Sequence, residues 1–425
     1  MRGESHVRPD IPYLSEVKRQ LLEQYVRGDV GRHAPEPLIS GRPPGAPALT
    51  ERRQQLVRLR ELSLEDYPQI VALESQYGLG SLSYDQWSHV WLNNPAYREL
   101  RNNWPIGWVL EDEKKQIVGS QGNIPLWYEF RRKRIIAASG RATVVDAPYR
   151  GYALWLLTAF FGQQNAELCF DTTANYEAAR DNEALGAPRV PVGAWDRNVF
   201  WITNYQGFLS SWLKGKMPEK MQPLVQPWCY PLAAALFLKD TPARSALRTL
   251  PSGSVVECCT AFDDRFDEFW EDLRSENTDL LLAVRNREVL QWHFAYALLR
   301  HRLWIWTITQ DSRMAAYAIF LKTEDPKSGA KRVSLVDFQA LRGNAALLLP
   351  MLSAALEECR SERVHVLQNV GLAFDKSSIN KLAPYRGRGS WWRYFYKARD
   401  EDLAEMLSNP GVWAPSLYDG DASIL

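Results

Sequence analysis

Cysteine is scarce in this chain, and the few present form no pattern. The 425 residues contain five, namely Cys169, Cys229, Cys258, Cys259 and Cys359. An odd number without the spacing of metal ligands predicts neither a disulfide framework nor a zinc site. Because secreted proteins rely on paired cysteines, we expect a protein of the reducing cytoplasm that binds no metal.

Long apolar runs and an excess of one charge are also missing. The longest apolar runs, Ala153–Phe161 and Leu232–Leu238, are too short to cross a bilayer. The charged N-terminus lacks the apolar core of a signal peptide. Lys and Arg number 51 against 50 Asp and Glu, a net charge of +1. This balance argues against nucleic acid or an anionic membrane as the main partner and predicts a soluble, non-spanning protein.

Aromatic residues, in contrast, are abundant, with 17 Trp and 18 Tyr. Their rings can stack on sugars, but they also fill the cores of sheet-rich proteins. The packing interpretation is favoured.

Residues 142–157 carry the most informative pattern. Thr143–Val145 predicts a strand, Pro148–Gly151 a turn and Tyr152–Gln163 an apolar helix. A strand that leads directly into a helix start leaves backbone N–H groups unpaired. Such a cluster binds anions, with pyrophosphate as the usual ligand.

This strand, turn and helix resemble the acyl-CoA-binding turn of the GNAT N-acyltransferases, where the pattern is Arg/Gln-x-x-Gly-x-Gly/Ala. The chain keeps Arg150 but has Ala153 at the first small position and Trp155 at the last. Trp155 would fill the phosphate pocket unless the helix turns it into the core. The resemblance implies acetyl-CoA or another acyl-CoA as co-substrate. It assigns to the donor site Val144, Val145, Arg150, Gly151, Tyr152, Ala153 and, from the next motif, Asn175.

That next motif, Asn175–Ala187, resembles the GNAT element in which a Tyr often protonates the CoA thiolate. Asn182 stands at the Tyr position and could offer sulfur only a weak hydrogen bond. For a general base we consider Glu129, Asp146 and Asp171, which lie near the strands around the expected cleft, although Asp146 could simply cap the turn. The predicted catalytic residues are therefore Asn182, Glu129 and Asp171. Alternatively, Asn175 is only a helix cap, and Glu129 only pairs with the basic run Arg131–Arg134, itself most simply a hairpin tip.

The order of predicted elements indicates two similar halves. Residues 56–206 follow the GNAT order of strands and helices, with strands predicted at Gln116–Leu126 and Tyr128–Ser139 and a final strand at Trp195–Tyr205. Residues 254–400 repeat this order more faintly, without the acyl-CoA turn and with a last strand at Trp392–Lys397. We expect an α/β fold with mixed sheets, made of two tandem GNAT-like domains of which the second is degenerate. The rest comprises an N-terminal helix (Ile11–Val26) and Pro/Gly-rich arm at 1–55, a connector at 207–253 and a C-terminal tail at 401–425.

The C-terminal sequence Tyr385–Lys397, with Trp413–Ser416 and Tyr418–Asp421, resembles the tail of GNAT-like proteins encoded with bacterial polysaccharide-synthesis genes. This resemblance implies a saccharide acceptor and either a homodimer or a polysaccharide-synthesis complex. Asp419 and Asp421 flank a glycine, and an exposed turn is favoured there over a metal or substrate site.

The leading hypothesis is transfer of an acetyl or related acyl group from CoA to an amine or hydroxyl, with a saccharide as acceptor. Trp155 and Asn182 support one alternative, a catalytically inactive scaffold or regulator of polysaccharide assembly. A second alternative is FemAB-like aminoacyl transfer, which the neutral charge disfavours.

Overall fold

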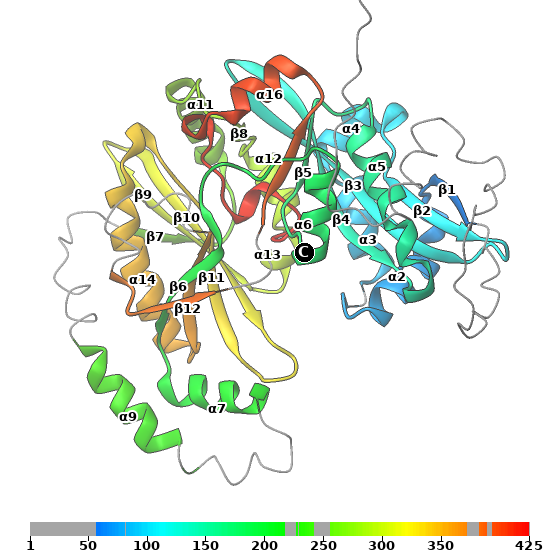
Figure 1. The fold of residues 1–425 in the computed structure, drawn as a ribbon. Helices are drawn as coiled ribbons and strands as arrows, with labels where there is room; N and C mark the ends of the chain where they lie inside the picture. Colours follow the sequence, from blue (N-terminus) through cyan, green and yellow to red (C-terminus); the bar gives the residue numbers. More distant parts are fainter. Residues whose placement is uncertain are drawn as a thin grey trace, which may run out of the picture.

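The computed structural model describes residues 57–80, 82–216, 227, 229–241, 256–371, 382–388 and 393–424. The predicted helix Ile11–Val26, the Pro/Gly-rich arm and part of the connector lie outside these residues. The described chain contains two seven-stranded mixed sheets with helices packed on them (Figure 1). The predicted α/β class is therefore confirmed.

The first sheet has the strand order β1-β2-β3-β4-β5-β14, and β8 pairs with β3. Its only parallel pair among the described strands is β4 with β5; the others are antiparallel. The strands are β1 (Val57–Glu61), β2 (Gly107–Asp112), β3 (Ile117–Phe130), β4 (Lys133–Val145), β5 (Leu168–Asp171), β8 (Leu282–Ala283) and β14 (Phe395–Ala398).

Helix starts in this half follow the capping chemistry of the sequence. Ser63 and Asp66 form a capping box ahead of α2, and Ser83 and Gln86 form another at the start of α3. The apolar helix α5 packs on β2, β3 and β4. The helices are α2 (Tyr67–Gln76), α3 (Tyr84–Leu92), α4 (Pro95–Leu100), α5 (Ala153–Gly162) and α6 (Tyr176–Ala184).

The second sheet has the order β13-β6-β12-β11-β10-β9-β7, and its parallel pair is β11 with β12. Its strands are β6 (Ala194–Ile202), β7 (Val256–Cys259), β9 (Leu303–Gln310), β10 (Arg313–Glu324), β11 (Lys331–Ala340), β12 (Val366–Gly371) and β13 (Tyr385–Arg388). The helices of this part are α7 (Tyr205–Lys216), α9 (Cys229–Lys239), α11 (Asp264–Glu276), α12 (Arg287–His293), α13 (Ala295–Leu299), α14 (Leu348–Ser361) and α16 (Glu401–Ser408).

The final strand of each half pairs with the sheet of the other half. The sequence pattern placed Trp195–Tyr205 at the end of the first sheet, but β6 pairs with β12 and β13 in the second. The pattern placed Trp392–Lys397 last in the second sheet, but β14 pairs with β5 in the first. Alternating apolar residues predict that a segment is a strand, but they do not show which strand it pairs with. The exchange joins both halves through one shared core, in which Trp87 and Tyr317 belong to the same apolar cluster.

The hairpin of β3 and β4 is longer than the sequence indicated. Separate strands at Gln116–Leu126 and Tyr128–Ser139 were expected, but β3 runs on to Phe130. The chain turns at Arg131 and Arg132, which have φ angles of 51° and 62°. Two such residues are typical of a type I′ turn. The interpretation of the basic run as a hairpin tip is thus confirmed.

Candidate active site

The parallel strands β4 and β5 pair over three residues and then separate. The pairing runs from Ala137 with Leu168 to Ser139 with Phe170. Beyond Ser139, β4 continues to Val145 and remains paired with β3, while β5 ends at Asp171. Within the described strands, the free edge of β4 after Ser139 is therefore available to a ligand backbone or amide. Val144 and Val145, predicted to bind the donor, lie on this stretch.

The turn after β4 is a 3-10 helix, Ala147–Tyr152, that continues into α5. Asp146 caps it, because its Oδ1 accepts from the N–H of Ala147 at 2.9 Å and from the hydroxyl of Tyr77 at 2.6 Å. The N–H of Tyr149 donates to the Asp146 carbonyl at 2.8 Å, and the N–H of Ala153 donates to the Arg150 carbonyl. The expectation that the turn leaves its N–H groups unpaired is therefore wrong for these donors, because a 3-10 turn closes on itself.

The surface of the turn is nevertheless open. Arg150 and Gly151 are exposed, and Tyr152 and Ala153 are half-buried. A Cβ added at Gly151 would meet no atom within 4 Å. The guanidinium of Arg150 and the space beside Gly151 together suit an anionic ligand such as a phosphate.

Trp155 does not cover this surface. Its side chain is 8% exposed and belongs to the apolar core of the first sheet. Its ring meets that of Tyr152 edge-on, with centroids 5.1 Å apart. The helix therefore points the Trp155 side chain into the core. The large ring, which replaces a small residue of the GNAT pattern, packs there and does not fill the turn.

Asp171 and Asn182 are brought together at the end of β5. The side-chain amide of Asn182 donates to Asp171 Oδ2 at 2.7 Å, and the N–H of Thr173 donates to Oδ1 at 3.3 Å. Burial raises the pKa of Asp171, and these two hydrogen bonds oppose the rise. Asn182 is fully buried, so its amide supports Asp171 and does not reach a surface where a thiolate could bind. Asn175 caps α6 by accepting from the N–H of Ala178 at 2.9 Å.

Glu129 lies away from this group. It is opposite Arg134, close to the hairpin tip, whereas β5 ends beside the far part of β4. Its carboxylate accepts from Arg274 of α11 at 3.1 Å and 3.3 Å. The structure does not bring Glu129 together with Asp171, and the ion-pair interpretation describes it better.

The C-terminal segment 416–424 lies between the two sheets, and this placement was missed by the sequence reading, which favoured an exposed turn. The hydroxyl of Tyr128 on β3 donates to the carbonyl of Asp419 at 2.8 Å. The hydroxyl of Ser416 donates to Asp337 on β11 at 2.9 Å. The sequence does show two carboxylates, Asp419 and Asp421, on either side of Gly420, but it does not show which residues they contact.

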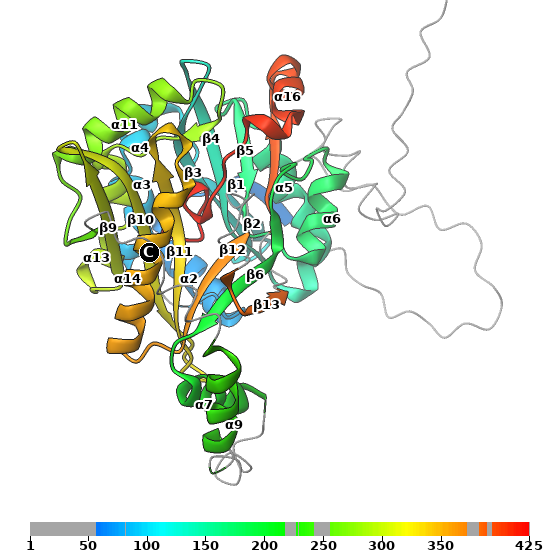
Figure 2. The ribbon, with the colours of Figure 1, turned by 90° about the vertical axis from the view of Figure 1, so that its left-hand side faces the viewer.

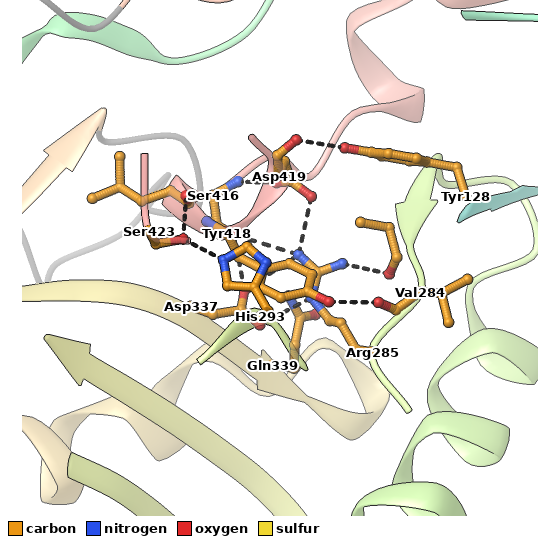
Figure 3. A network of polar contacts seen from close by, with 12 residues as sticks. Tyr128, Val284, Arg285, His293, Asp337, Gln339, Ser416, Tyr418, Asp419 and Ser423 are labelled. Atoms are coloured by element: carbon orange, nitrogen blue, oxygen red, sulfur yellow. Dashed lines mark hydrogen bonds and ion pairs between the residues drawn. The ribbon is translucent and has the colours of Figure 1, made fainter. Parts of the chain in front are cut away.

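A buried ion network holds this segment in place (Figure 3). Arg285 donates to Asp337 at 2.9 Å and to Asp419 at 3.2 Å, and its guanidinium lies over the Tyr418 ring at 4.6 Å. Burial disfavours the charged form of Arg285, but Asp337 and Asp419 outweigh it and raise its pKa. The three charges satisfy one another, which makes burial of all three tolerable.

His293 supports the end of the same segment. Its Nε2 lies 2.6 Å from the Ser423 hydroxyl, which itself donates to the Leu417 carbonyl at 3.0 Å. Because a hydroxyl has one proton to donate, Ser423 accepts here and His293 carries the proton on Nε2. Burial lowers the pKa of His293 to about 3, so its ring is neutral at pH 7.

Asp421 stands where β4 and β5 separate. The hydroxyl of Thr172, the residue after β5, donates to Asp421 Oδ1 at 3.2 Å. Burial raises the pKa of Asp421 to about 6, while Arg141 of β4 lowers it and Asp171 raises it further. Arg141 is also paired with Glu74 of α2 at 3.3 Å. Asp421 is thus a half-buried carboxylate with a pKa close to neutrality, which suits a general base.

Two buried polar atoms on or near the end of the β4–β5 pairing are without a hydrogen-bond partner among the described residues. They are the Ser139 hydroxyl, at the last paired position of β4, and Asn182 Oδ1. A small apolar cavity also borders Thr172 and has room for about one water molecule. It is lined by Tyr128, Phe170, Thr172, Leu281, Tyr394, Trp413, Pro415 and Asp419.

In the described residues no group of His, Cys, Asp or Glu is arranged to hold a metal ion. No helix described here is long and apolar enough to cross a membrane.

Comparison with known structures identifies the fold. No protein-family model and no curated protein matches the sequence. Saccharomyces cerevisiae N-myristoyltransferase, solved with bound myristoyl-CoA, superimposes with a TM-score of 0.50 and 10% identity, covering 87% of this chain and 82% of that one. A GCN5-related N-acetyltransferase from Kribbella flavida gives 0.50 and 10%, covering 81% and 71%. The chain therefore has a GNAT-like fold.

Proposed function

We propose that this protein is an acyl-CoA-dependent acyltransferase that moves a short acyl group to an amine or hydroxyl. The observation that carries the proposal is the separation of β4 and β5, with the exposed turn of Arg150 at one end and Asp421 where the strands part. Donor, acceptor and base would meet in this one place. Both proteins used for comparison bear names of acyl-group transferases.

The donor would lie along the free edge of β4. Its pantetheine amides would pair with the backbone near Val144 and Val145, and its phosphates would lie by Arg150 and Gly151. The acyl group would lie where β4 and β5 separate. Backbone N–H groups on the β4 edge would stabilise the oxyanion of the tetrahedral intermediate.

Asp421 would act as the general base. The acceptor nitrogen or oxygen attacks the thioester carbon, the new bond forms, and the C–S bond then breaks to release the CoA thiolate. The acceptor proton passes to the Asp421 carboxylate and then, through solvent, to the thiolate. With a pKa of about 6, Asp421 is mostly ionised at pH 7 and still basic enough to accept that proton.

Asp171 and Asn182 would be positioning residues. Asn182 fixes Asp171, whose negative charge helps to keep the pKa of Asp421 high. As acceptor we propose a saccharide of polysaccharide synthesis. This part rests on the resemblance of the C-terminal sequence alone.

Calorimetry with acetyl-CoA tests the donor site. We expect saturable binding by the full chain and weakening of about tenfold in Arg150→Glu, since that change replaces attraction to phosphate by repulsion. Arg132→Glu is the matched control, because Arg132 is an exposed arginine at the hairpin tip. Absence of binding up to millimolar acetyl-CoA would refute the proposal.

One observation favours a second candidate, a non-catalytic scaffold with this fold. The first N–H groups of the turn are engaged in hydrogen bonds within the turn, so a phosphate would have to compete for them. Such a scaffold would bind no acetyl-CoA. The same titration therefore separates the two candidates.

A further inference from the structure

A helical hairpin projects from the body of the protein. It consists of α7 and α9, which pack on each other and extend away from the second sheet (Figures 1 and 2). At its base the buried carboxylate of Asp240 accepts from the hydroxyls of Tyr205 at 2.8 Å and Tyr385 at 2.9 Å. The rings of Tyr205 and Phe237 meet edge-on at 5.7 Å. The hairpin is therefore firmly attached where it leaves the body.

The outer face of α9 is apolar, the reverse of an ordinary surface helix. Cys229, Ala233, Leu236 and Asp240 follow helical spacing and form the buried or half-buried stripe. The opposite side exposes only Tyr, Pro, Ala, Phe and Leu before the final lysine. A surface helix in water normally places polar residues there.

Large exposed apolar side chains gather on this hairpin. Five of the eight in the described residues belong to it, whereas Leu79, Tyr84 and Leu299 are scattered elsewhere. The five are Trp212 (52% exposed), Tyr230 (61%), Leu232 (51%), Phe237 (50%) and Leu238 (70%). A gathered apolar surface of this kind marks an interaction site.

The exposed charges on the two helices are all positive. Lys214, Lys216 and Lys239 are exposed, and the one acidic residue, Asp240, is buried at the base. The net charge of +1 is summed over the whole chain and therefore does not show this local excess of positive charge. Aromatic and aliphatic side chains bordered by lysines are the composition of a helix that lies in a membrane interface.

We propose that the α7–α9 hairpin docks on the surface of a bilayer containing anionic lipids. The 11 residues of α9 are too few to span the hydrocarbon core, so the hairpin would lie in the headgroup region with its apolar side chains inserted. Lys214 and Lys216, in the last turn of α7, would face lipid phosphates, whereas the ammonium group of Lys239 lies over the Tyr385 ring. A second copy of the chain fits less well, because a two-fold contact would bring like charges together. This docking is independent of acyl transfer.

Flotation with lipid vesicles tests the docking. The full chain should float with vesicles of phosphatidylcholine and phosphatidylglycerol, and salt should weaken this binding. We expect Leu232→Ser with Leu238→Ser, and separately Lys214→Glu with Lys216→Glu, to reduce flotation at least about tenfold, through lost insertion and reversed charge. Leu299→Ser is the matched control and should float like the wild type, because Leu299 is 74% exposed at a different place. Unchanged circular dichroism and melting would confirm that each variant is folded.

Three results would overturn the proposal. One is the absence of flotation by the folded wild type. Another is a dimer in ultracentrifugation that the leucine variants abolish while none of the proteins binds vesicles, which would make the hairpin a self-association surface. The third is flotation only after removal of residues 1–50, which would show that the chain's own N-terminal segment covers the hairpin.

Discussion

The hydroxyl of Thr172 donates a hydrogen bond of 3.2 Å to the carboxylate of Asp421, joining the end of β5 to the last residues of the chain. At the preceding residue, Gly420, an added Cβ would fall 1.9 Å from the Thr172 hydroxyl oxygen. The C-terminal segment is therefore fitted closely against the strand end. This contact puts a carboxylate at the candidate site that β4 and β5 form.

Replacing Asp421 by asparagine should lower kcat by about 100-fold or more, because general bases contribute about that much and an amide cannot accept the proton. The KM for acetyl-CoA should change little. In the wild type, kcat/KM should rise with pH through about 6 as Asp421 loses its proton. Steady-state kinetics across pH measure both effects.

Asp402→Asn is the control, because Asp402 is an exposed acid on α16. Equal activity of Asp421→Asn and the wild type would rule out the assigned role. Loss of activity with an unchanged pH profile would point to a structural role only.

Gly420→Ala should displace the C-terminal segment, since its Cβ would overlap Thr172. We expect destabilisation of about 1–3 kcal/mol, the usual cost of overpacking, together with reduced activity. Gly162→Ala should have neither effect, because its Cβ would meet no atom within 4 Å. Urea unfolding of both variants provides the comparison, and equal midpoints would contradict the close fit.

Arg285→Leu should be the most destabilising of these changes. It leaves Asp337 and Asp419 buried without their shared cation, which typically costs about 3–5 kcal/mol. Arg287→Leu, at a half-buried arginine whose partner Asp267 lies near the surface, should cost no more than about 1 kcal/mol. Denaturant titration followed by circular dichroism measures both, and a similar loss in the two variants would show that the buried network contributes no more to stability than a surface ion pair.

His293 should make the protein less stable in acid. Its pKa is about 3 when folded against 6.5 for an ordinary histidine, so between these values only the unfolded chain binds this proton. Lowering the pH from 6.5 toward 3 then reduces the free energy of unfolding, by up to about 1.4 kcal/mol per pH unit. Asp421 has the opposite sign between 3.8 and about 6, because its proton is held by the folded state.

Comparison of the wild type with His293→Gln isolates this contribution, since both keep Asp421. The stability of the variant should depend less on pH over that range. Parallel stability curves for the two proteins would contradict the buried neutral histidine.

Trp155→Ala should destabilise the protein by about 3–5 kcal/mol, as for other large core side chains, and leave acetyl-CoA affinity unchanged. Thermal unfolding and calorimetry on the same preparations measure the two effects. Much tighter binding in the variant would mean that the native indole blocks the donor site.

Local features of the site could be predicted from the sequence. The strand before Val145, the turn at Arg150, the apolar helix after it and the cap at Asn175 all follow from short-range rules of propensity and capping. The pairing of Glu129 with a base could also be anticipated, although the partner is Arg274 and not the adjacent basic run. These features depend on residues a few positions apart.

Contacts between residues far apart in the chain could not be predicted from the sequence. Alternating residues in β6 and β14 predict strands, but their exchange between sheets depends on which edges remain open after the rest has folded. From the sequence, Asp421 is expected to be an exposed acid. In the fold it lies beside Thr172, which is 249 residues away in sequence. Likewise, Trp155 departs from the small residue expected in the GNAT turn. Only the structure shows that α5 points this side chain into the core and so leaves the turn open. The sequence by itself determined the local elements and their order. The tertiary structure decided which strands pair and which carboxylate reaches the site, because burial and pairing depend on the whole chain.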